Sequence, residues 1–197
     1  GDYASKSLIG YMLTYIENTM KMPLVAIREA IEYANENLFA EGRKNPELAG
    51  MGTTVVAASI IDNILYVFNV GDSRCYILEE NGISQITKDH SLVEMLVSKG
   101  EITRESEEYR ENKSKITRAV GAEEKVLIDN FEVELFGNEH ILLCSDGLTN
   151  MVEDEKIFNI ISSGANVKAS AKRLIEEANL SGGSDNISIL LIDINEG

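Results

Sequence analysis

Three aspartates lie in settings where a carboxylate could bind a metal ion. They are Asp72 in 71-GDSR-74, Asp146 in 145-SDG-147 and Asp185 in 182-GGSDN-186. Each lies at one end of an apolar run that is typical of a strand, next to glycine or serine. A carboxylate buried in such a turn needs a cation, a metal ion or several hydrogen-bond donors. If the three strand ends meet, a divalent ion would offset the repulsion among the carboxylates, and Mg²⁺ and Mn²⁺ prefer oxygen ligands.

Two metal ions held in this way could activate a water molecule for attack on phosphorus. An ordinary explanation is open for each motif taken alone, because Asp-Gly and Gly-Asp sequences occur in many turns for conformational reasons. The spacing therefore predicts a hydrolytic metal site only if the fold brings all three motifs together.

The charge of the chain limits its partners. Its 197 residues include 33 acidic and 18 basic ones, which gives a net charge of -15. Nucleic-acid backbones and anionic membranes both require a basic face, so neither is an expected partner. No apolar run approaches the roughly 20 residues of a membrane helix, and no signal segment opens the chain. We predict a cytoplasmic protein, in which Cys75 and Cys144 are buried free thiols.

The hydrophobic pattern predicts helices in pairs and strands in runs. In the first helix the apolar residues form one stripe of a 3.6-residue period, made of Leu8, Ile9, Met12, Leu13, Ile16 and Met20. The predicted helices span 3–20, 24–40, 152–162 and 167–178, and the predicted strands span 53–60, 64–70, 74–79, 83–86, 126–135, 140–144 and 186–194.

The connections among the first four strands are too short for crossovers, which predicts an antiparallel meander. Asn81-Gly82 is a strong hairpin dipeptide within it. Residues 88–117 are polar and charged, as expected of a functional flap or lid. Because strands and helices do not alternate, the pattern predicts an α+β architecture of stacked antiparallel sheets with helices outside.

Taken together, these motifs resemble the metal-dependent serine/threonine protein phosphatases, the PPM or type 2C family, in its short bacterial form. The matching stretches, in order, are 51-MGTTVVAA-58, 69-NVGDSRCYIL-78, 86-ITKDHSLVEMLVSKGEIT-103, 116-ITRAVG-121, 141-ILLCSDGLTNMV-152 and 183-GSDNIS-188. Each is modestly specific, but they span most of the chain and keep the family's order.

The resemblance implies two antiparallel sheets packed as a sandwich and flanked by antiparallel helix pairs. It also implies two or three Mn²⁺ or Mg²⁺ ions in an intact family member, which hydrolyses phosphoserine and phosphothreonine with a metal-activated water. Asp146 and Asp185 are expected to bind the second metal, and Asp72 is expected to share the third with Asp146. Beyond these metal ligands, no catalytic side chain is expected in this sequence.

The sequence departs from the family at its start. The family's first two strands, its metal-bridging Asp-Gly motif and its phosphate-binding arginine have no match here, because Gly1 to Ser5 resembles the segment just downstream of them. We therefore expect residues 1–197 to be one PPM-type domain without its N-terminal segment, with weak activity or none. Strand edges exposed in this way could pair with another chain, so a dimer or a domain swap is expected.

The expected partners are phosphorylated proteins, above all a cognate serine/threonine kinase and its substrates. The alternative is a binding module on the same fold that recognises a phosphoprotein or kinase without hydrolysis. No loop of alternating calcium ligands is present, which disfavours a calcium-binding protein. In the flap, His90 is expected to be a structural anchor rather than a catalytic acid, and Asp89 to cap the helix that follows Ser91. Asp129 is interpreted as structural.

Overall fold

The computed structural model describes residues 2–194. The chain forms two compact units that alternate along the sequence. The first unit comprises Gly1–Ser59, Phe68–Asp72 and Asp89–Asn130, and the second comprises Ile60–Val67, Ser73–Lys88 and Phe131–Gly197. That residues 1–197 form one domain stays a prediction. Within residues 2–194, no helix is both long enough and apolar enough to span a bilayer.

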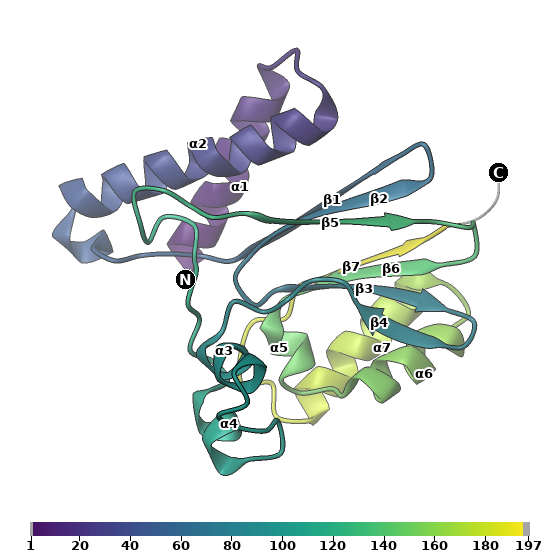
Figure 1. Cartoon of the computed structure of the whole chain (residues 1–197). Helices are drawn as coiled ribbons and strands as arrows, with labels where there is room; N and C mark the ends of the chain where they lie inside the picture. The colour runs from purple at the N-terminus through teal and green to yellow at the C-terminus, as the bar shows by residue number, and fades with distance from the viewer. Residues whose placement is uncertain (1, 195–197) are drawn as a thin grey trace. The chain divides into compact units, whose positions relative to one another are not determined.

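The strands form two antiparallel sheets, so the predicted α+β class is confirmed (Figure 1). One sheet has the order β1-β2-β5 and the other the order β4-β3-β6-β7. The strands are β1 (Val55–Ile61), β2 (Ile64–Val70), β3 (Arg74–Glu79), β4 (Gly82–Gln85), β5 (Asp129–Glu134), β6 (His140–Cys144) and β7 (Ile189–Asp193).

The predicted four-strand meander is wrong, because β2 and β3 follow one another in sequence but belong to different sheets. A short connection can also carry the chain from one sheet to another, so loop length alone did not determine the pairing. Each half of the meander is a hairpin, and β3 pairs with β4 in the register Leu78 opposite Ile83. On its other side β3 pairs with β6, with Tyr76 opposite Leu142.

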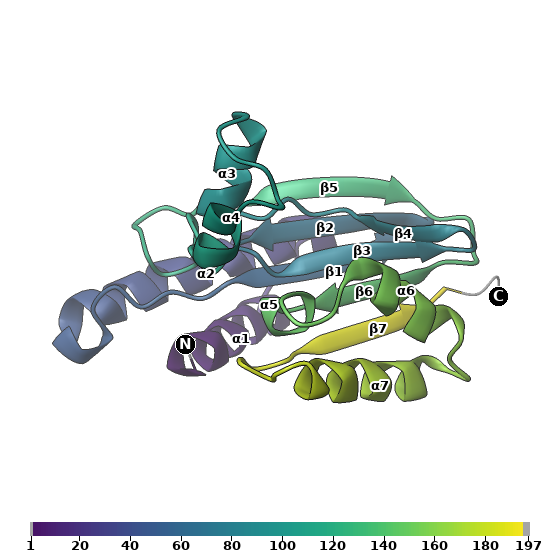
Figure 2. The same cartoon turned by 90° about the horizontal axis from the view of Figure 1, so that it is seen from below.

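In the second unit, helices cover one face of the four-stranded sheet (Figure 1, Figure 2). These helices are α5 (Asp146–Thr149), α6 (Asp154–Ser162) and α7 (Val167–Leu180). The sheet contributes Tyr76, Leu78, Leu142 and Cys144 to the core, which are alternate residues of β3 and β6 and therefore share a face. The helices contribute Leu148, Val152, Ile157, Ile160, Ile161, Leu174 and Ala178.

Two hydrogen bonds within this core involve the hydroxyl of Tyr76, whose side chain is fully buried. Its hydroxyl accepts a hydrogen bond from Nη1 of Arg74 at 2.9 Å and donates one to Oδ1 of Asp154 at 3.0 Å. Asp154 lies in the first turn of α6. The hydroxyl therefore satisfies its hydrogen-bonding capacity and fixes the Arg74 guanidinium at the start of β3.

In the first unit, α1 (Asp2–Glu17) packs on α2 (Pro23–Lys44). The contact uses Ala4 and Leu8, which are buried, and the rings of Tyr11 and Tyr15, whose centroids lie 6.1 and 5.5 Å from that of Tyr33. Of the apolar stripe predicted from sequence, Leu8 is buried, whereas Ile9, Leu13 and Ile16 are 59%, 53% and 39% exposed. Leu8 of the stripe therefore contacts α2 together with Ala4, Tyr11 and Tyr15 of a neighbouring face.

The flap contains α3 (Leu92–Ser98) and α4 (Glu107–Asn112), which lie next to one another (Figure 2). The cap of α3 is Ser91, whose hydroxyl accepts from the Glu94 amide, so the capping role predicted for Asp89 belongs to its neighbour two residues on. Serine in the extended conformation reaches the third amide of the helix directly. Glu94 then accepts hydrogen bonds from Arg104 and Tyr109, at 2.7 and 2.8 Å.

Outside the flap, a short helix, η1 (Pro46–Leu48), follows α2.

Both cysteines are free and buried, as predicted. Burial raises the pKa of the Cys75 thiol to about 12, from an unperturbed value of 9.0. The unfolded chain therefore releases this proton at a lower pH than the folded chain. The stabilisation from the protonated thiol is fully present below pH 9 and is lost as the pH rises from about 9 towards 12.

We expect Cys75→Ala to flatten the alkaline pH dependence of stability. The cavity left by the substitution lowers the free energy of unfolding equally at every pH. The variant lacks the thiol, however, whose ionisation in the unfolded chain lowers the free energy of unfolding by about 1.4 kcal/mol at pH 10. Urea unfolding of both proteins at pH 7.5 and pH 10 measures the effect. The stability lost between the two pH values should be smaller for the variant, and parallel losses would contradict the assignment.

Candidate metal site

Asp146 begins a short helix at the end of β6. The sequence predicts a tight turn here, but the structure has Ser145 in an extended cap position and then the four-residue helix α5. The side chain of Leu148 in this helix is fully buried in the core of the second unit. Burial of this apolar side chain explains why the chain forms a helix here rather than an open loop.

Hydrogen bonds from the Ser145 backbone and hydroxyl join the segment around Asp146 to the segment around Asp185. The hydroxyl of Ser145 donates to the Asn186 carbonyl at 3.1 Å and accepts from the Ser188 amide at 3.0 Å. The Ser145 amide also donates to the Ser188 carbonyl at 3.0 Å. The Asn186 amide in turn donates to Oδ1 of Asp185 at 2.7 Å. These bonds hold the two aspartates on neighbouring segments.

Gly147 allows this close approach. A Cβ atom at this position would lie 2.3 Å from the Asn186 carbonyl oxygen and 2.9 Å from its carbonyl carbon. Both are backbone atoms, so a side chain at position 147 would push the Asp185 segment away. The Asp-Gly sequence therefore has a packing reason in addition to any turn chemistry.

The electrostatics of Asp146 favour a cation. Burial, followed by the negative charge of Asp185, raises the pKa of the Asp146 carboxyl. The Gly147 amide, the Asn150 side chain and the charge of Arg74 act in the opposite direction but do not cancel this. Asn150 donates to Oδ2 of Asp146 at 3.0 Å and orients it. Asp146 and the neighbouring Asp185 supply carboxylate oxygens, the donors that Mg²⁺ or Mn²⁺ prefers, and a cation would offset the repulsion that Asp146 experiences, so the residues present fit such an ion.

Asp72 lies in the first unit, in the connection between β2 and β3, and is 8% exposed. The structure thus brings Asp146 and Asp185 together in the second unit and places Asp72 in the other unit. Within residues 2–194, no group of three or more His, Cys, Asp or Glu side chains is arranged to hold a metal ion. The three-aspartate site stays a prediction.

A cluster in the first unit was only partly foreseen from sequence. The His90 cluster consists of His90, Asp129 and Arg118. Nε2 of His90 lies 3.1 Å from Oδ2 of Asp129, and Nη1 of Arg118 lies 2.7 Å from its Oδ1. Burial alone would raise the pKa of Asp129, but the bonds from His90 and Arg118 outweigh it and lower the pKa. No local signal in the sequence joins these residues, because they lie 11 to 39 positions apart.

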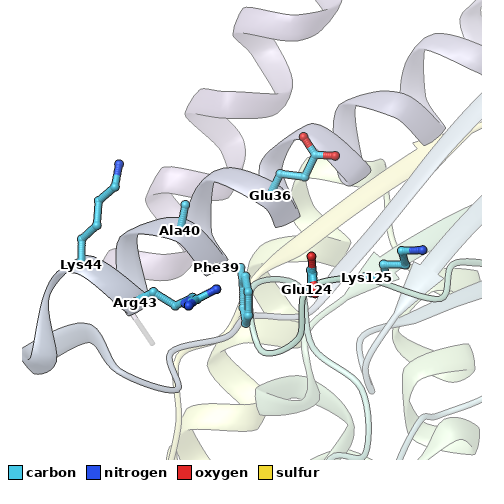
Figure 3. A pocket seen from close by; sticks show the side chains of 7 residues that line it. All are labelled: Glu36, Phe39, Ala40, Arg43, Lys44, Glu124 and Lys125. Carbon is cyan, nitrogen blue, oxygen red and sulfur yellow. The ribbon is translucent and has the colours of Figure 1, made fainter.

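A hollow lies elsewhere in the first unit (Figure 3). Its volume is about 650 Å³, and its lining is Glu36, Phe39, Ala40, Arg43, Lys44, Glu124 and Lys125. Buried Asn35 fixes its wall, because its amide nitrogen donates to the carbonyls of Glu123 and Glu124 at 3.1 Å each. None of the three aspartates lines this hollow, so it gives no support to the metal site.

Comparison with known proteins gives consistent matches. A family model described as protein phosphatase 2C matches residues 14–104. The serine/threonine phosphatase stp of Listeria welshimeri is 40% identical over 169 residues, which are 86% of this chain and 67% of that protein. The chain thus spans about two thirds of the length of its Listeria relatives.

Solved structures agree with the sequence matches. The crystal structure of the serine/threonine phosphatase Stp1 from Staphylococcus aureus has a TM-score of 0.91 at 31% identity, covering 99% of this chain and 78% of that one. The catalytic domain of the serine/threonine protein phosphatase PstP, in complex with two manganese ions, has a TM-score of 0.87 at 34% identity, covering 100% and 82%.

Proposed function

The chain belongs to the protein phosphatase 2C family, and from that premise we propose that it hydrolyses phosphoserine and phosphothreonine monoesters in proteins with bound Mn²⁺ or Mg²⁺. The observation that carries this proposal is the pairing of Asp146 with Asp185 through Ser145 and Gly147. Relatives that are named as serine/threonine phosphatases, and the manganese ions of PstP, support it.

The residues of this chain would have distinct tasks. Asp146 and Asp185 would hold one metal, and Asp72 would share a further metal with Asp146. When bound, a metal pair supplies an activated water for attack on phosphorus. Asn150 orients Asp146, and the Tyr76 hydroxyl fixes Arg74, whose charge acts on Asp146. We assign no catalytic side chain beyond the metal ligands.

On the 197 residues by themselves, we propose weak turnover or none. The resemblance places the metal-bridging carboxylate in an Asp-Gly motif that no stretch before Gly71 matches. We propose phosphorylated proteins as partners, among them a serine/threonine kinase and its substrates, and the cytoplasm as the location. The net charge of -15 argues against nucleic acid and anionic membranes.

The first experiment is Mn²⁺ titration calorimetry on the 197-residue chain, with phosphate release from a phosphothreonine peptide measured in parallel. We expect Mn²⁺ binding that falls at least tenfold in Asp146→Ala and is unchanged in Glu155→Gln, which alters an exposed carboxylate in the first turn of α6. Light scattering on the same sample tests the proposed dimer or swap through strand edges, and a monomer would contradict it.

A second experiment tests whether the protein is an enzyme. A chimera adds to this chain the part of the Listeria stp protein that the chain does not match. We expect Mn²⁺-dependent phosphate release that a chelator and Asp146→Ala both abolish. A folded chimera that binds the phosphopeptide without releasing phosphate would overturn the enzyme proposal and favour the binding module.

A further inference from the structure

The residue before Asp72 has both of its backbone polar atoms bonded to one histidine. Nδ1 of His90 accepts a hydrogen bond from the Gly71 amide at 3.0 Å. The His90 amide donates to the Gly71 carbonyl at 3.0 Å, and Nδ2 of Asn69 donates to the same carbonyl at 3.2 Å. His90 is 7% exposed, so these bonds are shielded from water. The conformation of the chain at Asp72 therefore depends on the position of His90.

The orientation of the His90 ring is set from its other side. Because Nδ1 accepts an N–H, the proton of the neutral ring lies on Nε2. Nε2 faces Oδ2 of Asp129 at 3.1 Å and can donate to it. Arg118 holds the second oxygen of Asp129 at 2.7 Å. A carboxylate that accepts from one ring nitrogen fixes which tautomer is present and leaves the other nitrogen as an acceptor.

His90 also lies where the two ends of the flap meet. The Thr117 amide donates to the His90 carbonyl at 2.7 Å. Ser91, the next residue, forms a bridge with Ile116 and caps α3. All of these residues belong to the first unit. One buried side chain thus contacts the turn before Asp72 and the start of β5, and its backbone joins both ends of the flap.

We propose that His90 is a positioning residue, which fixes the Gly71 amide and thereby the direction of the Asp72 carboxylate, and which links that carboxylate to the ends of the flap. The proposal rests on the proposed function, because it takes Asp72 as a metal ligand. His90 itself touches neither substrate nor metal in this role. It acts through Gly71, and Asp129 acts through His90.

Two amide side chains separate the functions of the two ring nitrogens. In His90→Asn, the side-chain oxygen can take the place of Nδ1 and accept from Gly71, but the bond to Asp129 is lost. In His90→Gln, the side-chain nitrogen can take the place of Nε2 and donate to Asp129, but the acceptor for Gly71 is lost. Both variants lose the ring, so a merely structural role would affect them alike.

The main readout is hydrogen exchange of the Gly71 amide, followed by NMR on the metal-free chain. We expect exchange at least tenfold faster in His90→Gln and within about threefold of the parent in His90→Asn, since an amide without its acceptor exchanges more readily. If His90→Gln does not fold, Asp129→Ala replaces it, and its Gly71 amide should also exchange faster. Equal exchange rates in all folded variants would overturn the proposal.

The second readout is Mn²⁺ binding, measured by calorimetry in a double-mutant cycle with Asp72→Asn. We expect His90→Gln to weaken Mn²⁺ binding at least fivefold when Asp72 is present and to have no effect in the Asp72→Asn background. An equal effect in both backgrounds would overturn the proposal. If Asp72→Asn leaves Mn²⁺ binding unchanged, the metal role of Asp72 in the proposed function fails, while the exchange of Gly71 still decides whether His90 fixes this turn.

Discussion

Gly147→Ala is expected to lower the free energy of unfolding by about 3 kcal/mol, at the upper end of the usual cost of overpacking. The new methyl group would lie 2.3 Å from the Asn186 carbonyl oxygen, far inside contact distance. That oxygen cannot move alone, because the Asn186 carbonyl and both backbone groups of Ser188 are bonded to Ser145. The segment from Asp185 to Ser188 must shift as a whole.

The shift has a second effect at the metal site. Because Asp185 adjoins Asn186, displacement of the segment changes the separation of the two carboxylates. We therefore expect Mn²⁺ binding to weaken at least tenfold in Gly147→Ala. Urea unfolding and calorimetry measure the two effects. A variant of parental stability with unchanged Mn²⁺ binding would show that the segments separate at little cost.

Gly10→Ala is the matched control for this prediction. Gly10 lies within α1, is exposed, and has nothing within 4 Å of the position of a Cβ atom. Alanine is favoured over glycine in a helix interior, so the substitution should raise the free energy of unfolding by about 0.5–1 kcal/mol. Opposite signs at Gly10 and Gly147 would assign the loss to the contact with Asn186 rather than to the added methyl group as such.

Gly71→Ala is expected to lower the free energy of unfolding by about 4 kcal/mol, from strain and overpacking together. Gly71 has a φ of 106°, which residues with a Cβ atom rarely adopt. A Cβ atom here would also lie 2.3 Å from the Cγ2 atom of Thr54 and 3.2 Å from its main-chain α-carbon. Because the second of these atoms belongs to the backbone, a change of the Thr54 rotamer cannot relieve the clash.

Gly50→Ala separates the two causes. Gly50 has a φ of 72° but nothing within 4 Å of the Cβ position, so its replacement measures conformational strain alone, about 1–2 kcal/mol. The excess loss in Gly71→Ala is then the clash with Thr54. Urea unfolding of both variants tests this, and equal losses would contradict the expected clash.

The sequence predicted individual elements better than their partners. The strands 64–70, 74–79 and 140–144 were predicted with the bounds that the structure has. Alternating apolar residues specify a strand, but they do not say which strand lies beside it, and the meander was wrong for that reason. Likewise, periodicity located α1, but Tyr11 and Tyr15 rather than Ile9 and Leu13 contact the next helix.

At the metal site too, the sequence identified residues but not the contacts that hold them in place. The residue types and the resemblance pointed to Asp146 and Asp185, and the structure holds their segments together. The bonds that do so start from Ser145, 41 to 43 residues away from its partners, where no sequence period can join them. The His90 cluster was missed as a group for the same reason, although His90 itself was expected to anchor the flap.

Buried Asn35 has a consequence for the chemical ageing of the chain. Its nitrogen faces two backbone carbonyls, whereas its oxygen accepts from the Gly121 amide at 2.7 Å. Deamidation would replace that nitrogen with oxygen and set a carboxylate against both carbonyls, in a position that is 2% exposed. Glu123 and Glu124 would then lose their hydrogen bonds to α2, whereas the Gly121 amide would keep an oxygen to which it can donate. The wall of the hollow in Figure 3 therefore depends on one atom that differs between asparagine and aspartate.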